Sequence, residues 1–219
     1  SADVGSGSGN AINTNIAIGV NSLTGGDFGS TGSRTLVDNI AIGANALNST
    51  GVNSQTGTVA IGKDALTALT SGDGNTAVGY LSLSTEDASG GSTAVGYRAL
   101  KDQNGSGAYN YNTAMGFEAG LDITTGLQNV MIGGYALGDA TTEVDDNVAI
   151  GYLAMGGAIG TEAVNDCVAI GSLALSGALD STNGVDEASG TVAIGKSALA
   201  ALTSGAVNTA IGFESMLAT

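Results

Sequence analysis

The chain has 219 residues, among them 37 glycines, no proline, no tryptophan, no histidine, and only 6 tyrosines and 3 phenylalanines. So few aromatic side chains do not fill the wide core of a globular domain of this length. The net charge of −15, from 20 acidic and 5 basic residues, leaves no basic stripe to meet the phosphates of DNA or RNA.

The first 14 residues, SADVGSGSGNAINT, lack the basic and apolar regions of a signal peptide. We expect residues 1–14 to be a linker or a segment that pairs with a neighbour, and residues 15–219 to form one repeat domain. No run of 18 apolar residues occurs, so membrane insertion is not expected.

From residue 15 onward a nine-residue motif recurs, as in NIAIGANAL at 39–47 and NVAIGYLAM at 147–155. Its glycines are 17 to 24 residues apart, and a fixed minimum with occasional insertions is typical of a solenoid whose coils stack on one another. The eleven structural glycines are Gly19, Gly43, Gly62, Gly79, Gly96, Gly116, Gly133, Gly151, Gly171, Gly195 and Gly212.

The three residues before each glycine predict a short strand. The first of them is always β-branched, the last is Ile, Val or Met, and alanine stands between them in all copies except the one with Met131. Because side chains alternate along a strand, one face is bulky and the other small. We expect the bulky face, Ile150 for example, to form the narrow core. The small alanine face would then let three chains approach closely.

A Leu or Met recurs four residues after the glycine, with Gly120 as the one gap, and predicts a second short strand or an extended turn with an inward leucine. A glycine interrupts every repeat, so no apolar stripe with the 3.6-residue period of a helix is present and a helical fold is excluded. The fold class is therefore predicted to be all-β, a parallel β-roll or β-solenoid of about eleven short coils.

Asparagine begins seven of the eleven motifs, for example Asn112, Asn129 and Asn147. Amides stacked one coil apart can hydrogen-bond along the axis as a ladder. The single cysteine, Cys167, occupies the same column and is expected to be a small buried thiol, since it has no partner for an intrachain disulfide.

Aromatic side chains directly follow the glycine in three consecutive coils, as Tyr80, Tyr97 and Phe117. With coils about 4.8 Å apart, these rings should form a ladder, either a structural stack or a platform for the sugars of a receptor. Tyr109 and Tyr111 lie in a connector and are candidates for receptor contact, because connectors commonly carry recognition.

Two acidic connectors offer oxygen atoms at alternating positions, as a Ca²⁺ site would, through Asp102 and Asn104 and through Asp180 and Asp186. Neither connector completes the EF-hand spacing. The alternative is a solvated, self-repelling surface that keeps a β-rich fibre soluble. No other cofactor is expected.

An enzyme is not expected. The absence of histidine excludes the usual Ser-His and Cys-His pairs, and the carboxylate pairs Asp145–Asp146 and Asp186–Glu187 lie in glycine-rich connectors. All insertions enter between motifs, so the longest connectors, 24–38 and 176–190, should emerge along one edge of the roll and engage a partner there.

The segments ITTGLQNVMIGGYAL (123–137) and LTSGAVNTAIGFESM (202–216) resemble the repeats of bacteriophage tail-fibre and related virion fibre proteins. The core N-x-A-I-G also resembles the head repeat of trimeric autotransporter adhesins. The resemblance implies a left-handed roll that forms homotrimers, a virion-fibre or cell-surface location, and attachment to a host cell-surface glycan or protein. Two alternatives stay open: a self-assembling extracellular filament subunit that contacts neighbouring subunits, and the head of an adhesin.

Overall fold

The computed structural model describes residues 11–24, 35–50, 53–105, 107, 109–139, 144–157, 159, 164–177 and 188–217. All regular secondary structure in these ranges is β-strand. The strands are β1 (Ala11–Asn13), β2 (Ile16–Ile18), β3 (Thr35–Val37), β4 (Ile40–Ile42), β5 (Gln55–Thr56), β6 (Val59–Ile61), β7 (Thr76–Val78), β8 (Thr93–Val95), β9 (Thr113–Met115), β10 (Val130–Ile132), β11 (Val148–Ile150), β12 (Val168–Ile170), β13 (Val192–Ile194) and β14 (Thr209–Ile211).

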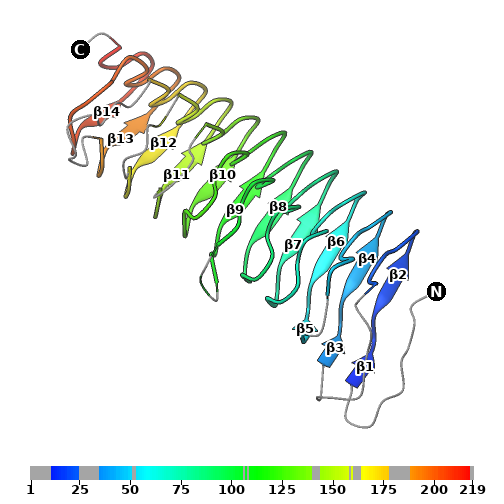
Figure 1. Ribbon diagram of the computed structural model, residues 1–219. Coiled ribbons are helices and arrows are strands. Elements are labelled where there is room, and N and C mark those ends of the chain that lie inside the picture. The colour runs from blue at the N-terminus through cyan, green and yellow to red at the C-terminus, as the bar shows by residue number, and fades with distance from the viewer. Residues whose placement is uncertain are drawn as a thin grey trace.

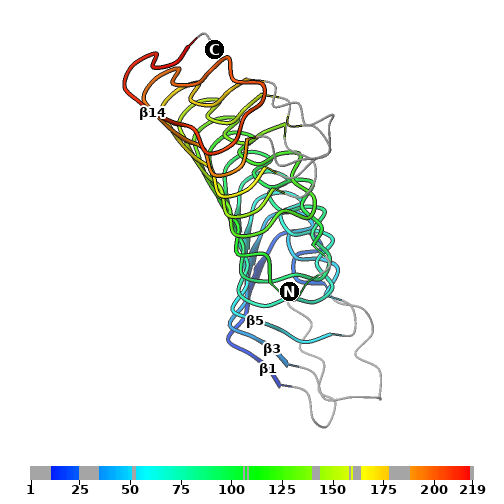
Figure 2. The ribbon, with the colours of Figure 1, turned by 90° about the vertical axis from the view of Figure 1, so that its left-hand side faces the viewer.

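Eleven strands, one from each repeat, form a single parallel sheet from β2 to β14. Each strand pairs with the equivalent strand of the next coil, so Val130 pairs with Val148 and Ile132 with Ile150. Figure 1 shows the strands side by side along an elongated solenoid, and Figure 2 shows its narrow cross-section. The predicted all-β parallel solenoid is confirmed, whereas the handedness and the trimer remain predictions.

A second, three-stranded parallel sheet, β1–β3–β5, lies beside the first coils. Its strand β1 falls within residues 1–14, which were expected to be a linker or a pairing segment, and pairs with β3 through Ala11↔Thr35 and Asn13↔Val37. The sheet contributes Leu36 of β3 to the buried interior.

The predicted orientation of the strands is wrong. The alanine column is buried inside the coil, with Ala149 fully inaccessible, while the bulky residues on either side, such as Val148 and Ile150, face outward and are half-buried. The physical reason is the thinness of the coil. The leucine of each turn, Leu137 for example, is fully buried against the inner face of the sheet, and little more than a methyl group fits between the two walls.

The leucines and methionines of this column lie on turns, not on second strands, and all ten of them have a left-handed backbone, as in Leu83 with φ 47°. A left-handed conformation costs an L-residue about 1 to 2 kcal/mol. Full burial of a leucine side chain stabilises by about 1.5 to 3 kcal/mol, which offsets that strain. The predicted inward leucine is thereby confirmed, whereas the segment that carries it is a compact turn and neither a second strand nor an extended turn.

The glycine column has two reasons to lack a side chain. At Gly79 the backbone has φ +145°, and a Cβ would lie 2.1 Å from the carbonyl oxygen of Gly96 in the next coil. Equivalent backbone overlaps recur along the column as far as Gly195, while at Gly212 the nearest atom is 4.0 Å away. The motif glycines are therefore structural, because adjacent coils stack backbone on backbone at this point.

The predicted asparagine ladder is present in the interior. Oδ1 of Asn129 accepts hydrogen bonds from the backbone N–H of Asn147, at 3.0 Å, and from its side-chain amide, at 3.2 Å. Nδ2 of Asn129 donates to the carbonyl of Val144 at 2.6 Å. Cys167 continues the column: its N–H donates to Asn147 Oδ1 at 3.0 Å, and burial raises the pKa of its thiol. Each amide thus satisfies polar groups of two coils.

Candidate interaction surfaces

The outer face of the eleven-stranded sheet is a continuous uncharged surface. Two side chains per strand point outward, and every one of them is Ile, Val, Met or Thr. They range from half-buried to exposed, with Met115 49% and Ile18 59% accessible. Strands about 4.8 Å apart give this face a length of roughly 50 Å and, at about 10 Å in width, an area of roughly 500 Å². Apolar patches of that size on single chains are commonly functional.

The composition of this face changes in the middle of the solenoid. The first outward position is Thr in β7, β8 and β9, as Thr76, Thr93 and Thr113, and Ile or Val in the strands on either side. The same three coils carry Tyr80, Tyr97 and Phe117 after the glycine. The last coil, with Thr209 and Phe213, repeats the combination.

The predicted aromatic ladder forms and is longer than expected. Tyr80 stacks on Tyr97 at 5.3 Å between ring centroids, and Tyr97 on Phe117 at 5.0 Å with 7° between the planes. Tyr135 and Tyr152 extend it by edge contacts at 5.4 and 6.1 Å. Sequence reasoning left Tyr135 out because it stands one position later than the others, after Gly134.

The stacking decides which part of each ring a partner can reach. Both faces of Tyr97 lie against neighbouring rings, so its edge and hydroxyl are what remain for contact. At one end, the Lys63 ammonium lies 5.4 Å from the Tyr80 ring centroid. A sugar that needs a free ring face does not find one at Tyr97. This geometry favours the structural stack over the sugar platform.

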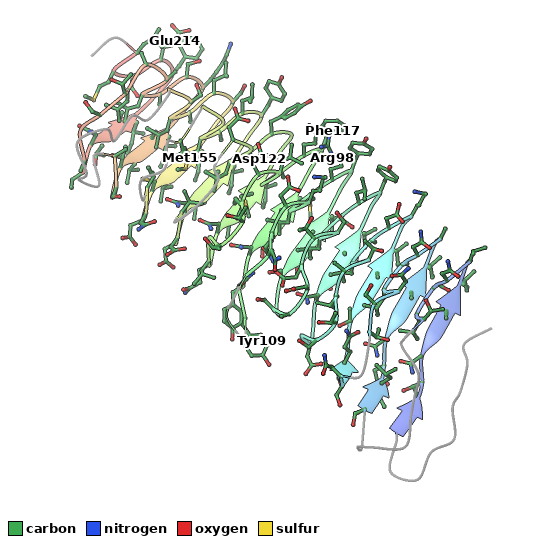
Figure 3. All side chains as sticks on the ribbon, viewed as in Figure 1. Arg98, Tyr109, Phe117, Asp122, Met155 and Glu214 are labelled. Carbon is green, nitrogen blue, oxygen red and sulfur yellow. The ribbon has the colours of Figure 1, made fainter. Side chains whose placement is uncertain are left out.

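Tyr109 and Tyr111 form a second aromatic surface, here called the tyrosine pad. The rings stack at 5.4 Å and 14° and are 46% and 58% accessible. They lie against Gly91, where a Cβ would come within 3.1 Å of Tyr111 and 3.2 Å of Tyr109. Figure 3 shows Tyr109 on the side where the strands begin and Phe117 on the side where they end. The pad and the ladder are therefore separate surfaces.

A buried carboxylate holds the connector beneath the pad. Glu86 has no accessible surface, and its Oε1 accepts hydrogen bonds from the N–H groups of Ala88 and Ser89, at 3.1 and 2.7 Å. Its Oε2 accepts from Gly105 N–H at 3.3 Å and from Asn110 Nδ2 at 3.1 Å, and also from Gln103 Nε2 at 3.0 Å. Asn110, between the two pad tyrosines, is thereby fixed inward.

The buried role of Glu86 was not predicted from the sequence, because Glu86 stands in an acidic connector and looks like any other solvated acid there. The exposed neighbour Asp87 has the same surroundings in the sequence and a different role. The one available signal was the length of the next coil, from Gly96 to Gly116, which supplies partners of Glu86. It has 20 residues against the minimum of 17.

The calcium candidates receive no support from side-chain geometry. Asp102 pairs with Lys101 at 2.5 Å, and Asn104 donates its backbone N–H to the carbonyl of Thr124 at 2.8 Å. Asp180 and Asp186, like most of the connectors 24–38 and 176–190, lie outside the described residues. Within the described ranges, no three His, Cys, Asp or Glu side chains gather as a metal site would require.

The described basic side chains all have partners within the chain. Arg98 pairs with Glu118 at 2.6 Å beside the aromatic ladder, Lys63 pairs with Asp64, and Lys196 lies over the Phe213 ring at 5.8 Å. Lys101, paired with Asp102, completes the set. The uncharged outer face of the sheet is thus flanked by a surface with a large excess of carboxylates.

Comparison with known proteins finds no matching family model, no matching curated protein and no matching solved structure. In the described ranges the chain also has no helix that could span a membrane.

Proposed function

We propose that this chain is a structural segment of an extracellular fibre of the virion type, in which parallel copies assemble through the outer face of the eleven-stranded sheet. Three copies is the number that the resemblance to virion fibres and adhesin heads implies. The tyrosine pad, beside the N-terminal ends of the strands, is the proposed contact with a host cell-surface glycan or protein.

One observation carries the proposal: the outer face bears no charge on a chain whose net charge is −15. Two copies that approached by any acidic flank would bring carboxylates together, and like charges in an interface are costly. Meeting through the Ile/Val face avoids that repulsion and removes an apolar patch from water. The occupant that best fits the face is therefore a second copy of the same face.

The small alanine face was expected to let three chains approach closely. The alanines instead lie inside each coil and cannot bring chains together. The outward Ile and Val side chains take over that role. Assembly also fits the architecture, since each thin coil buries few side chains of its own and covering the outer face would remove further apolar surface from water.

Analytical ultracentrifugation tests the assembly. We expect the native chain to sediment as a trimer at micromolar concentration, and Ile42→Asp/Ile150→Asp to sediment as a folded monomer with an unchanged circular dichroism spectrum. A native chain that stays monomeric overturns the proposal. Long unbranched filaments in electron micrographs would instead favour the filament subunit.

Binding to a glycan array and to host-cell surfaces tests the pad. Tyr109→Ala/Tyr111→Ala should lose binding without a change in assembly, because the rings lie away from the sheet face. Tyr97→Ala, within the aromatic ladder, is the matched control and should keep binding. If the pad variant binds as the native chain does, the pad is not the attachment site.

A further inference from the structure

We infer that Thr76, Thr93 and Thr113 set the axial register in which copies of this chain assemble. The inference rests on the self-association proposed above and adds to it the residues that decide how one copy aligns with the next. The three threonines occupy the first outward position of consecutive strands β7, β8 and β9.

A periodic interface has a register problem. Each coil presents nearly the same pair of side chains, so sliding one copy by one coil, about 4.8 Å, replaces Ile or Val by Ile or Val over most of the face. Register is weakly specified wherever the pattern along an interface is uniform. Some departure from the pattern must distinguish the aligned arrangement from its slipped neighbours.

The threonines supply that departure. They are half-buried, and within the described part of the chain none of their hydroxyls makes a side-chain hydrogen bond. A hydroxyl has one donor and two acceptor positions. These hydroxyls are therefore free to bond to groups outside their own chain.

Parallel copies around a common axis place each residue at the height of its counterparts. In the aligned arrangement Thr76 meets Thr76 of the other copies, and the hydroxyls can donate to and accept from one another. Each of the three layers is then polar and satisfied, within a face that is otherwise Ile, Val and Met except for Thr209 in the last strand.

A slip of one coil breaks this match at both ends of the block. Thr76 then meets Val59 of the shifted copy, and Val130 meets Thr113, so hydroxyls face apolar side chains without a partner. An unsatisfied buried polar group is costly, and a slip of two coils doubles the number of such layers. One buried polar residue fixes the register of a coiled coil in the same way.

Crosslinking between two labelled populations tests the inference. In a Cys167→Asn background, one population carries Ile132→Cys and the other Ile150→Cys, two outward positions that are paired neighbours in β10 and β11. The populations are refolded together and treated with a short bifunctional thiol reagent. Aligned copies give same-site crosslinks, and copies slipped by one coil give mixed 132–150 crosslinks.

With the native threonines we expect same-site crosslinks to dominate. In T76V/T93V/T113V the mixed share should rise about tenfold, because the only outward hydroxyl that a slip then leaves without a counterpart is that of Thr209, which is exposed in the last strand. Adding V130T/V148T/V168T to that variant moves the block of three to β10, β11 and β12, where Val192 separates it from Thr209, and should restore same-site crosslinking. This rescue separates register from any general effect of the valines.

The outcomes distinguish the two proposals. A chain that sediments as a monomer refutes the self-association. Assemblies that give abundant mixed crosslinks with the native threonines, or almost none in T76V/T93V/T113V, leave self-association in place and refute the register role of the threonines.

Discussion

Met131 fills the space that Gly120 leaves in the preceding coil. A Cβ on Gly120 would lie 2.7 Å from the Met131 sulfur and 2.9 Å from Leu100 Cδ2. These two residues are the exceptions to the repeat: Gly120 stands in the leucine column, and Met131 is the only non-alanine in the alanine column. The interior therefore conserves volume across coils, so that a small residue in one wall is offset by a large one in the other.

Met131→Ala should destabilise the chain by about 3 kcal/mol, because it opens a cavity in a close-packed interior. Gly120→Leu alone should also destabilise, since the new side chain overlaps Met131. The double variant recreates the Leu/Ala arrangement of the other coils and should recover most of the native free energy of unfolding. Urea denaturation measures all three, and costs that simply add in the double variant would contradict the exchange of volume.

Opposite outcomes are expected for two adjacent residues of β11. Ala149→Asp places an unpaired carboxylate in the interior and should cost about 4 kcal/mol or more. Ile150→Asp places the same group on the outer face, where the isolated chain exposes it to water, and should leave the coil folded. Circular dichroism melts in dilute solution compare the two. Equal losses would mean that Ile150 faces the interior.

The glycine column offers a further matched pair. Gly79→Ala should cost about 3 kcal/mol or more, because its Cβ would overlap the Gly96 backbone in a conformation that L-residues rarely adopt. Gly74 also has positive φ, +69°, but a Cβ there meets nothing within 4 Å. Gly74→Ala should therefore cost only about 1 kcal/mol, the left-handed strain alone. Similar melting temperatures for the two variants would show that overlap between coils is unimportant.

The sequence predicts the strands, the glycine stack and the asparagine ladder because each depends on a local requirement. The β-branched triplets favour strands, and a residue such as Asn129 can satisfy polar groups of two coils. Those requirements repeat with the motif, and the motif carries no insertion. The register of Val130 with Val148 follows directly from them.

Alternation along the strand does not by itself predict which face of the sheet is buried. It places Ala149 and Ile150 on opposite faces, but it does not decide which of the two faces the interior. The distance between the two walls of the coil decides, and it depends on how far the opposite turn brings in leucines such as Leu137. The role of Glu86 is equally invisible in the sequence, because its donors come from residues up to 24 positions away.

Glu86→Gln should destabilise the connector under the tyrosine pad by about 3 kcal/mol, because an amide nitrogen would face N–H donors that now bond to a carboxylate oxygen. Asp87→Asn removes a charge from the exposed neighbouring side chain and is the matched control. Hydrogen exchange of the Ser89 and Gly105 amides reports the effect locally. Unchanged protection of these amides in Glu86→Gln would show that the carboxylate does not hold the connector.

The stability of the chain should depend on pH through Asp122. Burial raises the pKa of its carboxyl above the ordinary value of 3.8, and the nearby Asp102 and Asp139 carboxylates raise it further. Between the ordinary and the raised pKa, the folded chain binds more protons at this site than the unfolded chain does. The contribution of Asp122 to stability therefore falls as pH rises through that window and is least favourable above it.

Asp122→Asn removes the titrating group and the charge. At neutral pH the variant should melt at a higher temperature than the native chain, and the difference should shrink as the pH falls through the raised pKa towards 3.8. Asp87→Asn, which removes one carboxylate from an exposed position, tests for the general effect of lowering the net charge. If both variants raise the melting temperature equally at neutral pH, relief of overall repulsion is the cause, and the local environment of Asp122 is not.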